Sequence, residues 1–95
     1  MASYSDPFRP RHEPARSIYD AFQQEAMHRR GRSVEEWSAA EVDAVLKAAN
    51  DYAKANGLPP VSRQDVERAE RYARGSIDYG AKWAYAVTED LRRKA

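Results

Sequence analysis

The side chains best suited to metal binding or proton transfer in this sequence are its two histidines. His12 lies among prolines, and His28 precedes a run of arginines whose positive charge opposes the binding of a cation. Neither histidine has a second histidine or a carboxylate four residues away, the spacing that places two ligands on one helix face. We therefore expect solvated surface histidines, with no metal site and no cofactor.

Acidic residues occur close together at four places, where paired carboxylates could act as general acid and base. Such catalysis needs one carboxyl group of a pair in an apolar pocket that raises its pKa. Most of these residues instead have arginines at helical spacing, as Glu70 has in Arg74, which is typical of exposed ion pairs. The chain also has no cysteine, so thiol nucleophiles are excluded and we expect no enzymatic activity. The neighbouring carboxylates are Glu35 with Glu36, Glu41 with Asp43, Glu67 with Glu70, and Glu89 with Asp90.

A third group of residues suits binding rather than catalysis. The segment 75–83 concentrates two aromatic rings, a lysine and a carboxylate close to two arginines. Tyr, Trp and Arg are enriched where proteins bind one another, because each buries a large area and keeps a polar group. Two interpretations stay open: the rings pack inside the protein, or they form a contact surface for a partner. The predicted contact residues are Arg71, Arg74, Asp78, Tyr79, Lys82 and Trp83.

Length and composition place these residues in one small domain. The chain has 95 residues, of which 42% are hydrophobic and 33% are charged, and its formal net charge is +1. Such a balance creates no strong field of one sign that would attract nucleic acid or a membrane surface. The N-terminus lacks the apolar stretch of a signal peptide, and no run approaches the roughly 18 apolar residues of a membrane span. We expect a soluble, cytoplasmic protein without membrane contact.

The first elements along the chain are an arm and a helix. Three prolines restrict the backbone of residues 1–16, which we expect to be an extended or disordered arm. A first helix is predicted over residues 17–30, where apolar residues recur at helical spacing. Ser17 and Asp20 resemble a capping pair at its start, and Gly31 is the expected stop at its end.

The second predicted helix has signals at both ends. Ser33 and Glu36 fit the S-x-x-E capping box and directly precede a periodic apolar segment. Gly57 follows the segment in the position of a left-handed cap, and two prolines come soon after it. We therefore expect this helix to run from Ser33 to Asn56.

The last third of the chain reads as one helical pattern with an open question in its middle. Ser62 and Asp65 form a second capping pair at its start. A straight helix over residues 62–94 would extend roughly 50 Å and protrude from a chain of this size. A break at Gly75, with Ser76 as the cap of a fourth helix, is the alternative. Both interpretations stay open.

Two apolar stripes follow this pattern and indicate that the segment has two neighbours. One consists of three residues with aromatic rings, Tyr72, Tyr79 and Trp83. The other is made mostly of small residues that let a second backbone come close: Val66, Ala69, Ala73, Ile77, Gly80, Ala84, Val87 and Leu91. No stretch alternates apolar and polar residues as a strand would. The sequence thus predicts an all-α domain over residues 17–95, a small bundle of three to four helices behind the flexible arm.

Four short motifs carry a resemblance that spans about residues 18–91 and leaves out the arm. They are Tyr19-Asp20-Ala21-Phe22, Gly57-Leu58-Pro59, the run from Asp65 to Glu70, and Asp78-Tyr79 followed by Lys82-Trp83. Through them the chain resembles small helical accessory proteins of tailed phages and prophages. No catalytic motif is known for such proteins, so no functional residue is carried over. The resemblance implies a setting in which accessory proteins often bind and disable a host factor, defence systems included.

These observations predict a protein that binds a macromolecule without catalysis. The expected partner is a host protein or protein complex, which it would occlude or hold in an inactive form, in the host cytoplasm if the protein is phage-encoded. Three alternatives stay open. An oligomer could enclose a nucleotide as a small-ligand sponge, or the small-residue stripe could join copies of a structural homo-oligomer. Nucleic acid could bind the basic side of the third helix, although acidic residues lie among the basic ones and oppose phosphates. The basic residues are Arg63, Arg68, Arg71, Arg74 and Lys82.

Overall fold

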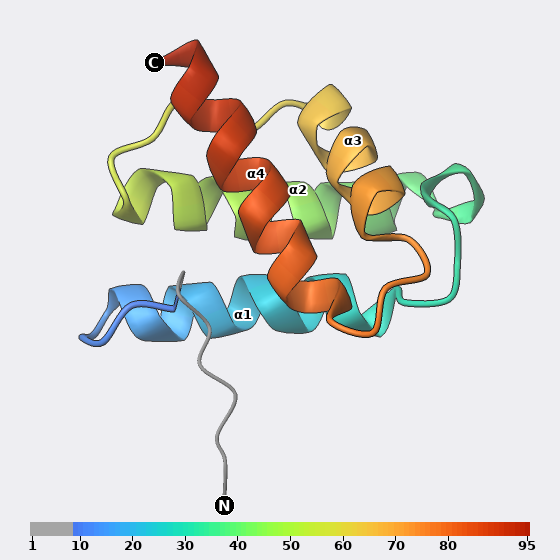
Figure 1. The fold of residues 1–95 in the computed structure, drawn as a ribbon, viewed down its shortest axis with the longest axis horizontal. Helices are drawn as coiled ribbons and strands as arrows, with labels where there is room; N and C mark the ends of the chain where they lie inside the picture. The colour runs from blue at the N-terminus through green and yellow to red at the C-terminus, as the bar shows by residue number, and fades with distance from the viewer. Residues whose placement is uncertain (1–8) are drawn as a thin grey trace, which may run out of the picture.

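Four α-helices in two layers form the structure, a computed structural model that describes residues 9–95. The part of the predicted arm that covers residues 1–8 lies outside the described residues. One layer holds α1 and α2 in antiparallel directions, and the other holds α3 and α4, with the start of α4 against α1 and its middle passing in front of α2 (Figure 1). Residues 9–95 contain no strand, so the all-α prediction is confirmed. The elements are α1 Ala15–His28, the 3-10 turn η1 Val34–Glu36, α2 Ala39–Ala55, α3 Arg63–Ala73 and α4 Tyr79–Lys94.

Helix α1 begins at Ala15, two residues earlier than predicted, and its first turn is held by a different carboxylate. The backbone N–H of Ser17 donates to Glu13 Oε1 at 2.9 Å. Asp20, the expected capping partner, instead accepts two hydrogen bonds from the guanidinium of Arg9, at 2.8 and 2.9 Å. The capping pair predicted at this helix is therefore wrong, because an acidic residue four positions before Ser17 reaches the free backbone N–H first.

The start of α2 differs from its prediction in the same way. The capping box is formed by Ser38 and Glu41, each side chain accepting from the other residue's backbone N–H at 3.1 Å. The predicted box at Ser33 is wrong: that side chain makes no cap hydrogen bond and precedes only the single turn η1. The reason is tertiary, since Trp37 has an extended backbone and is buried at 7% exposure, which separates η1 from α2.

The end of α2 is confirmed as predicted. Gly57 has a φ of +67°, the left-handed conformation that glycine adopts without strain. The backbone N–H of Leu58 then donates to Ala53 O at 2.9 Å, and that of Gly57 donates to Lys54 O at 3.2 Å. These two bonds form a Schellman motif, which satisfies carbonyl groups that the last helical turn leaves unpaired.

The last third of the chain is broken into two helices. Ser62 and Asp65 form the predicted capping box of α3. The longest extent of the molecule is 34 Å, which a straight helix of about 50 Å would exceed. The chain turns at Gly75, whose φ is +79°. Of the two predicted alternatives, the one with a break at Gly75 is therefore the one observed. Ser76 does not cap α4, however; Asp78 is the residue at the N-cap position, and its side chain makes no cap hydrogen bond.

The turn between α3 and α4 changes which residues face the core. The small-residue stripe is buried at every predicted position except Ile77, which is 93% exposed. The aromatic stripe is divided as well, since Tyr79 and Trp83 are buried and Tyr72 is 49% exposed. Ile77 is exposed because it lies in the five-residue turn between the helices. Tyr72 is exposed because this turn interrupts the helical register that would place it on one face with Tyr79 and Trp83.

Candidate protein-contact face

Two of the six predicted contact residues lie inside the protein. Tyr79 is 2% exposed and Trp83 is fully buried. The indole of Trp83 stacks on Trp37 at 6.1 Å between ring centroids and meets the edge of Phe22 at 6.3 Å. Burial also raises the pKa of the Tyr79 hydroxyl, which keeps that group neutral. The interpretation in which these rings pack in the core therefore holds, and a partner cannot touch them in this conformation.

Two more of the six residues, Arg71 and Arg74, form ion pairs at the end of α3. Arg71 and Arg74 both donate to the carboxylate of Glu35 in η1, at 2.7 and 3.1 Å. The hydrogen bond from Arg71 holds the pKa of Glu35 below its ordinary value. Arg74 also binds the buried carboxylate of Glu70, whose other hydrogen bond comes from the backbone N–H of Val34. These arginines therefore attach η1 to α3.

The remaining two residues, Asp78 and Lys82, lie on the outer side of α4. The ammonium group of Lys82 is 5.3 Å from the centre of the Tyr72 ring, within the range of a cation–π contact. That ring in turn stacks on Tyr85, with 5.9 Å between ring centroids. The structure thus joins Lys82 to two stacked tyrosines, one from α3 and one from α4.

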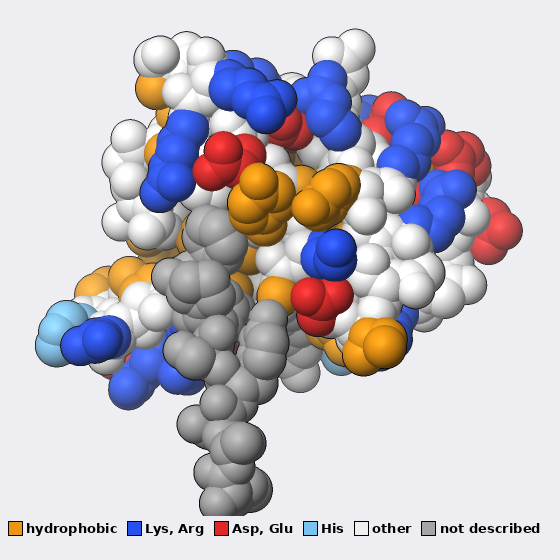
Figure 2. Space-filling view, in the orientation of Figure 1, with side chains coloured by type: hydrophobic (Ala, Val, Ile, Leu, Met, Phe, Trp, Pro, Cys, Tyr) orange, Lys and Arg blue, Asp and Glu red, His pale blue; other side chains and the backbone are white. Residues whose placement is uncertain are grey.

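Exposed apolar side chains gather on this side of the molecule. Among the described residues, the exposed large hydrophobic side chains are Met27 at 41%, Tyr72 at 49%, Ile77 at 93% and Tyr85 at 45%. Met27 and Ile77 line one shallow hollow of about 630 Å³ between α1 and the start of α4. Figure 2 shows hydrophobic side chains over α4 and the adjoining part of α3, next to basic and acidic ones. The α4 face, as we define it, consists of Met27, Tyr72, Ile77, Asp78, Ala81, Lys82 and Tyr85.

Five residues of the α4 face were not among the predicted contact residues: Met27, Tyr72, Ile77, Ala81 and Tyr85. Ile77 had been assigned to the buried stripe, while Met27 and Tyr85 had no role in the predicted surface. One signal was present for two of them: Ala81 and Tyr85 are four residues apart, which aligns them along one side of α4, whereas Ile77 lies in the turn before that helix. The spacing alone does not say whether that side faces the core or the solvent.

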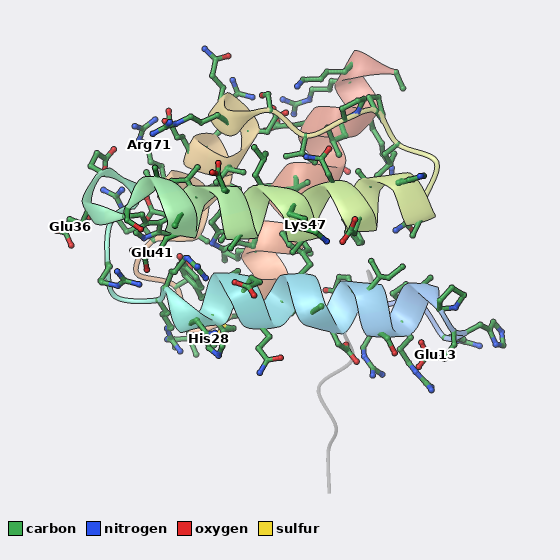
Figure 3. All side chains as sticks on the ribbon, turned by 180° about the vertical axis from the view of Figure 1, so that it is seen from behind. Glu13, His28, Glu36, Glu41, Lys47 and Arg71 are labelled. Carbon is green, nitrogen blue, oxygen red and sulfur yellow. The ribbon has the colours of Figure 1, made fainter. Side chains whose placement is uncertain are left out.

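Carboxylates neutralise the arginines of α3. Arg63 binds Glu67 at 3.3 Å, and Arg68 binds Asp90 at 3.1 Å, in addition to the pairs that Arg71 and Arg74 form with Glu35. Figure 3 shows Arg71 at the same end of the molecule as Glu36 and Glu41, at the acidic start of α2. A phosphate that approached α3 would compete with a carboxylate at each arginine, which reduces the gain from binding.

The ion pair between Arg32 and Glu41 predicts an acid-dependent part of the stability. The hydrogen bond from Arg32, assisted by one from the Ser38 amide, lowers the pKa of Glu41 from 4.5 to about 2. A lowered folded-state pKa stabilises the fold above the unfolded value, and this contribution is lost as pH falls from about 4.5 to about 2. In Glu41→Gln the amide oxygen still accepts the Ser38 bond but carries no charge.

We therefore expect the wild-type protein to lose more stability than Glu41→Gln when the pH is lowered from about 6 to about 3. Urea unfolding of both proteins at the two pH values measures the difference. Equal losses would show that the Arg32–Glu41 pair makes no pH-dependent contribution.

Nothing in the described part of the chain indicates a metal site or a membrane span. Residues 9–95 hold no group of three or more His, Asp and Glu side chains placed to bind an ion. None of their helices is both long enough and apolar enough to cross a bilayer. Comparisons with protein-family models, with curated proteins and with solved structures each find no match.

Proposed function

We propose that this protein acts without catalysis, by binding another protein through the α4 face. The observation that carries the proposal is that all the exposed large hydrophobic side chains of residues 9–95 border this one face. Clusters of exposed apolar side chains bordered by polar ones are typical of surfaces that bind other proteins. Stacked tyrosines with a lysine beside them also have the composition of interface centres, where aromatic rings bury area and keep polar groups.

The pairing of charges favours a protein over a nucleic acid as the partner. A strand of nucleic acid needs basic side chains that are available to phosphates, and the three arginines of α3 and Arg74 directly after it are paired with carboxylates. On the α4 face, Lys82 is the basic residue and Asp78 is an acidic residue one helical turn away. A face with one charge of each sign beside apolar groups suits a protein surface of mixed composition.

The proposed mode of action is occupation of a surface. The resemblance to phage accessory proteins implies a host complex as the target, which this protein would block sterically. A host protein and a second copy of this chain are both partners that the α4 face can accept, since both would cover the same apolar side chains.

The variant Ile77→Asp tests the proposal with little risk to the fold. The side chain is 93% exposed, so its replacement should leave the melting temperature unchanged. A carboxylate at the centre of an apolar interface should weaken binding by roughly tenfold or more, because the charge is desolvated there without a partner. Quantitative capture of bound proteins on immobilised wild-type protein and on the variant measures the change.

Lys47→Asp is the matched control, because it places a carboxylate on the opposite layer. Its side chain is 81% exposed on α2, on the rear side of the molecule that Figure 3 shows, away from α4. We expect Lys47→Asp to keep the proteins that wild type binds and Ile77→Asp to lose them. The same bound proteins on all three samples would contradict a role for the α4 face.

A further inference from the structure

We infer that a second copy of this chain covers the α4 face, with the two α4 helices packed antiparallel across a two-fold axis. The inference rests on the proposed function, because it names the partner of the same surface. The residues of the face are arranged so that an antiparallel copy complements them, in both apolar contacts and charge.

Apolar residues lie on both sides of one small side chain. Ile77, in the turn just before α4, lines the hollow beside Ala81, and Tyr85 follows Ala81 by about one helical turn. When two α4 helices cross antiparallel near Ala81, Ile77 of each copy lies against Tyr85 of the other. A two-fold axis repeats every contact between residues i and j as a contact between j and i. The contact between Ile77 and Tyr85 would therefore occur twice in the interface.

The charges have nearly the same centre. Asp78 and Lys82 lie one helical turn apart, centred one residue from Ala81, so the antiparallel copy brings each carboxylate toward the other copy's ammonium group. The carboxylate of Asp78 is available for this contact because it makes no cap hydrogen bond at the start of α4. Lys82 is half-buried over the Tyr72 ring, which restrains its ammonium group on the same face.

The centre of the face also permits close approach. Helices pack at about 8–10 Å between axes, and small side chains at the crossing point allow the shorter distances. Gly80 faces α1, because it is buried and a Cβ added to it would clash with Gln23 Oε1. Ala81, the next residue, is half-buried and lines the hollow beside Ile77, so a methyl group is what the second helix would meet.

The neighbouring ionised groups do not oppose this arrangement. Arg68 beside the tyrosines is paired with Asp90 at 3.1 Å, and Arg71 is paired with Glu35. Arg9, which lines the hollow, forms two hydrogen bonds to Asp20. The charges that the second copy meets directly are therefore those of Asp78 and Lys82.

A charge reversal within one chain tests the inference. Light scattering after size-exclusion chromatography, at about 10 μM and about 500 μM, should show a species of twice 10.8 kDa whose share rises with concentration. Asp78→Lys places lysines opposite one another at two points, and Lys82→Asp does the same with aspartates. Each single variant should weaken dimerisation by about tenfold or more, because like charges meet in the interface.

The double variant Asp78→Lys with Lys82→Asp restores both opposite-charge pairs, so dimerisation should return toward the wild-type level. Only an interface between two copies, in which each chain supplies both charges, gives this recovery. Thermal unfolding of each variant checks that the fold persists, and Lys47→Asp should dimerise as wild type does.

Two results would overturn the inference: a wild-type protein that is monomeric at both concentrations, or a double variant that stays as weak as the single ones. Either result leaves the proposed function standing if wild type still binds a different protein that Ile77→Asp loses. If wild type neither dimerises nor binds a different protein that Ile77→Asp loses, the α4 face is not a contact surface.

Discussion

Replacing Trp83 with alanine is expected to lower the free energy of unfolding by about 3–5 kcal/mol, the range for large aromatic side chains in a core. The indole is fully buried and joins three helical segments through rings: it contacts Phe22 of α1, Trp37 after η1 and Tyr79 at the start of α4. Its removal leaves a cavity where these segments meet, and the neighbouring rings cannot all collapse into it. Urea unfolding followed by far-ultraviolet circular dichroism measures the loss.

Two further variants show what the loss comes from. Trp83→Phe keeps a ring and also removes the indole N–H, which has no hydrogen-bond partner within the described structure, so the loss should be clearly smaller than for alanine. Tyr72→Ala removes a ring that is 49% exposed, and we expect it to cost less than about 1 kcal/mol. If Trp83→Ala were as mild as Tyr72→Ala, the indole would lie at the surface, and the prediction that it contacts a partner would regain its basis.

Glu70→Ala is expected to cost about 2–3 kcal/mol, the largest effect among the polar residues. The carboxylate is 1% exposed and accepts the backbone N–H of Val34 at 3.2 Å, as well as two donors of Arg74. Alanine leaves the buried N–H of Val34 unpaired, which by itself costs about 1–3 kcal/mol. The loss of the charge pair adds less than in a closed core, because the side chain of Arg74 is 45% exposed and water can solvate it.

Glu70→Gln and Glu67→Ala separate the two contributions. The amide oxygen of glutamine can still accept the Val34 N–H, so Glu70→Gln should recover a substantial part of the loss. Glu67 lies three residues earlier on α3 and pairs with the exposed side chain of Arg63, so its replacement by alanine should change stability by at most about 0.5 kcal/mol. Urea unfolding of the three variants gives the comparison, and equal losses for Glu70→Ala and Glu67→Ala would show that burial of Glu70 adds nothing.

The helix-capping patterns illustrate how far local sequence signals reach. Ser33 and Ser38 are each followed three residues later by a glutamate, and only the second pair caps α2. The same reading was correct at Ser62, where Asp65 forms the box. The motifs at Ser33 and Ser38 offer the same donors and acceptors. The choice between them comes from the burial of Trp37, which stops η1 after one turn.

The structure separates the predicted contact residues: Tyr79 and Trp83 are buried, while Asp78 and Lys82 reach the surface. Helical spacing alone cannot say whether Tyr79 and Trp83 or Tyr85 face the core. That choice depends on the angle at which α4 leaves the turn after Gly75 and on which helix it meets. Once the start of α4 lies against α1, Trp83 reaches Phe22 and Tyr85 is left beside Tyr72.

The sequence by itself determined what depends on residues a few positions apart: the helical class, the end of α2 at Gly57, the start of α3 at Ser62, and the small residues that α3 and α4 bury. Hydrogen bonds at helix ends and the spacing of apolar residues are local, and they can be read along the chain. Only the tertiary structure decided that Arg71 binds Glu35 rather than a partner and that the exposed rings belong to the α4 face. Those outcomes arise from contacts between helices, whose geometry is set by the packing of the whole core.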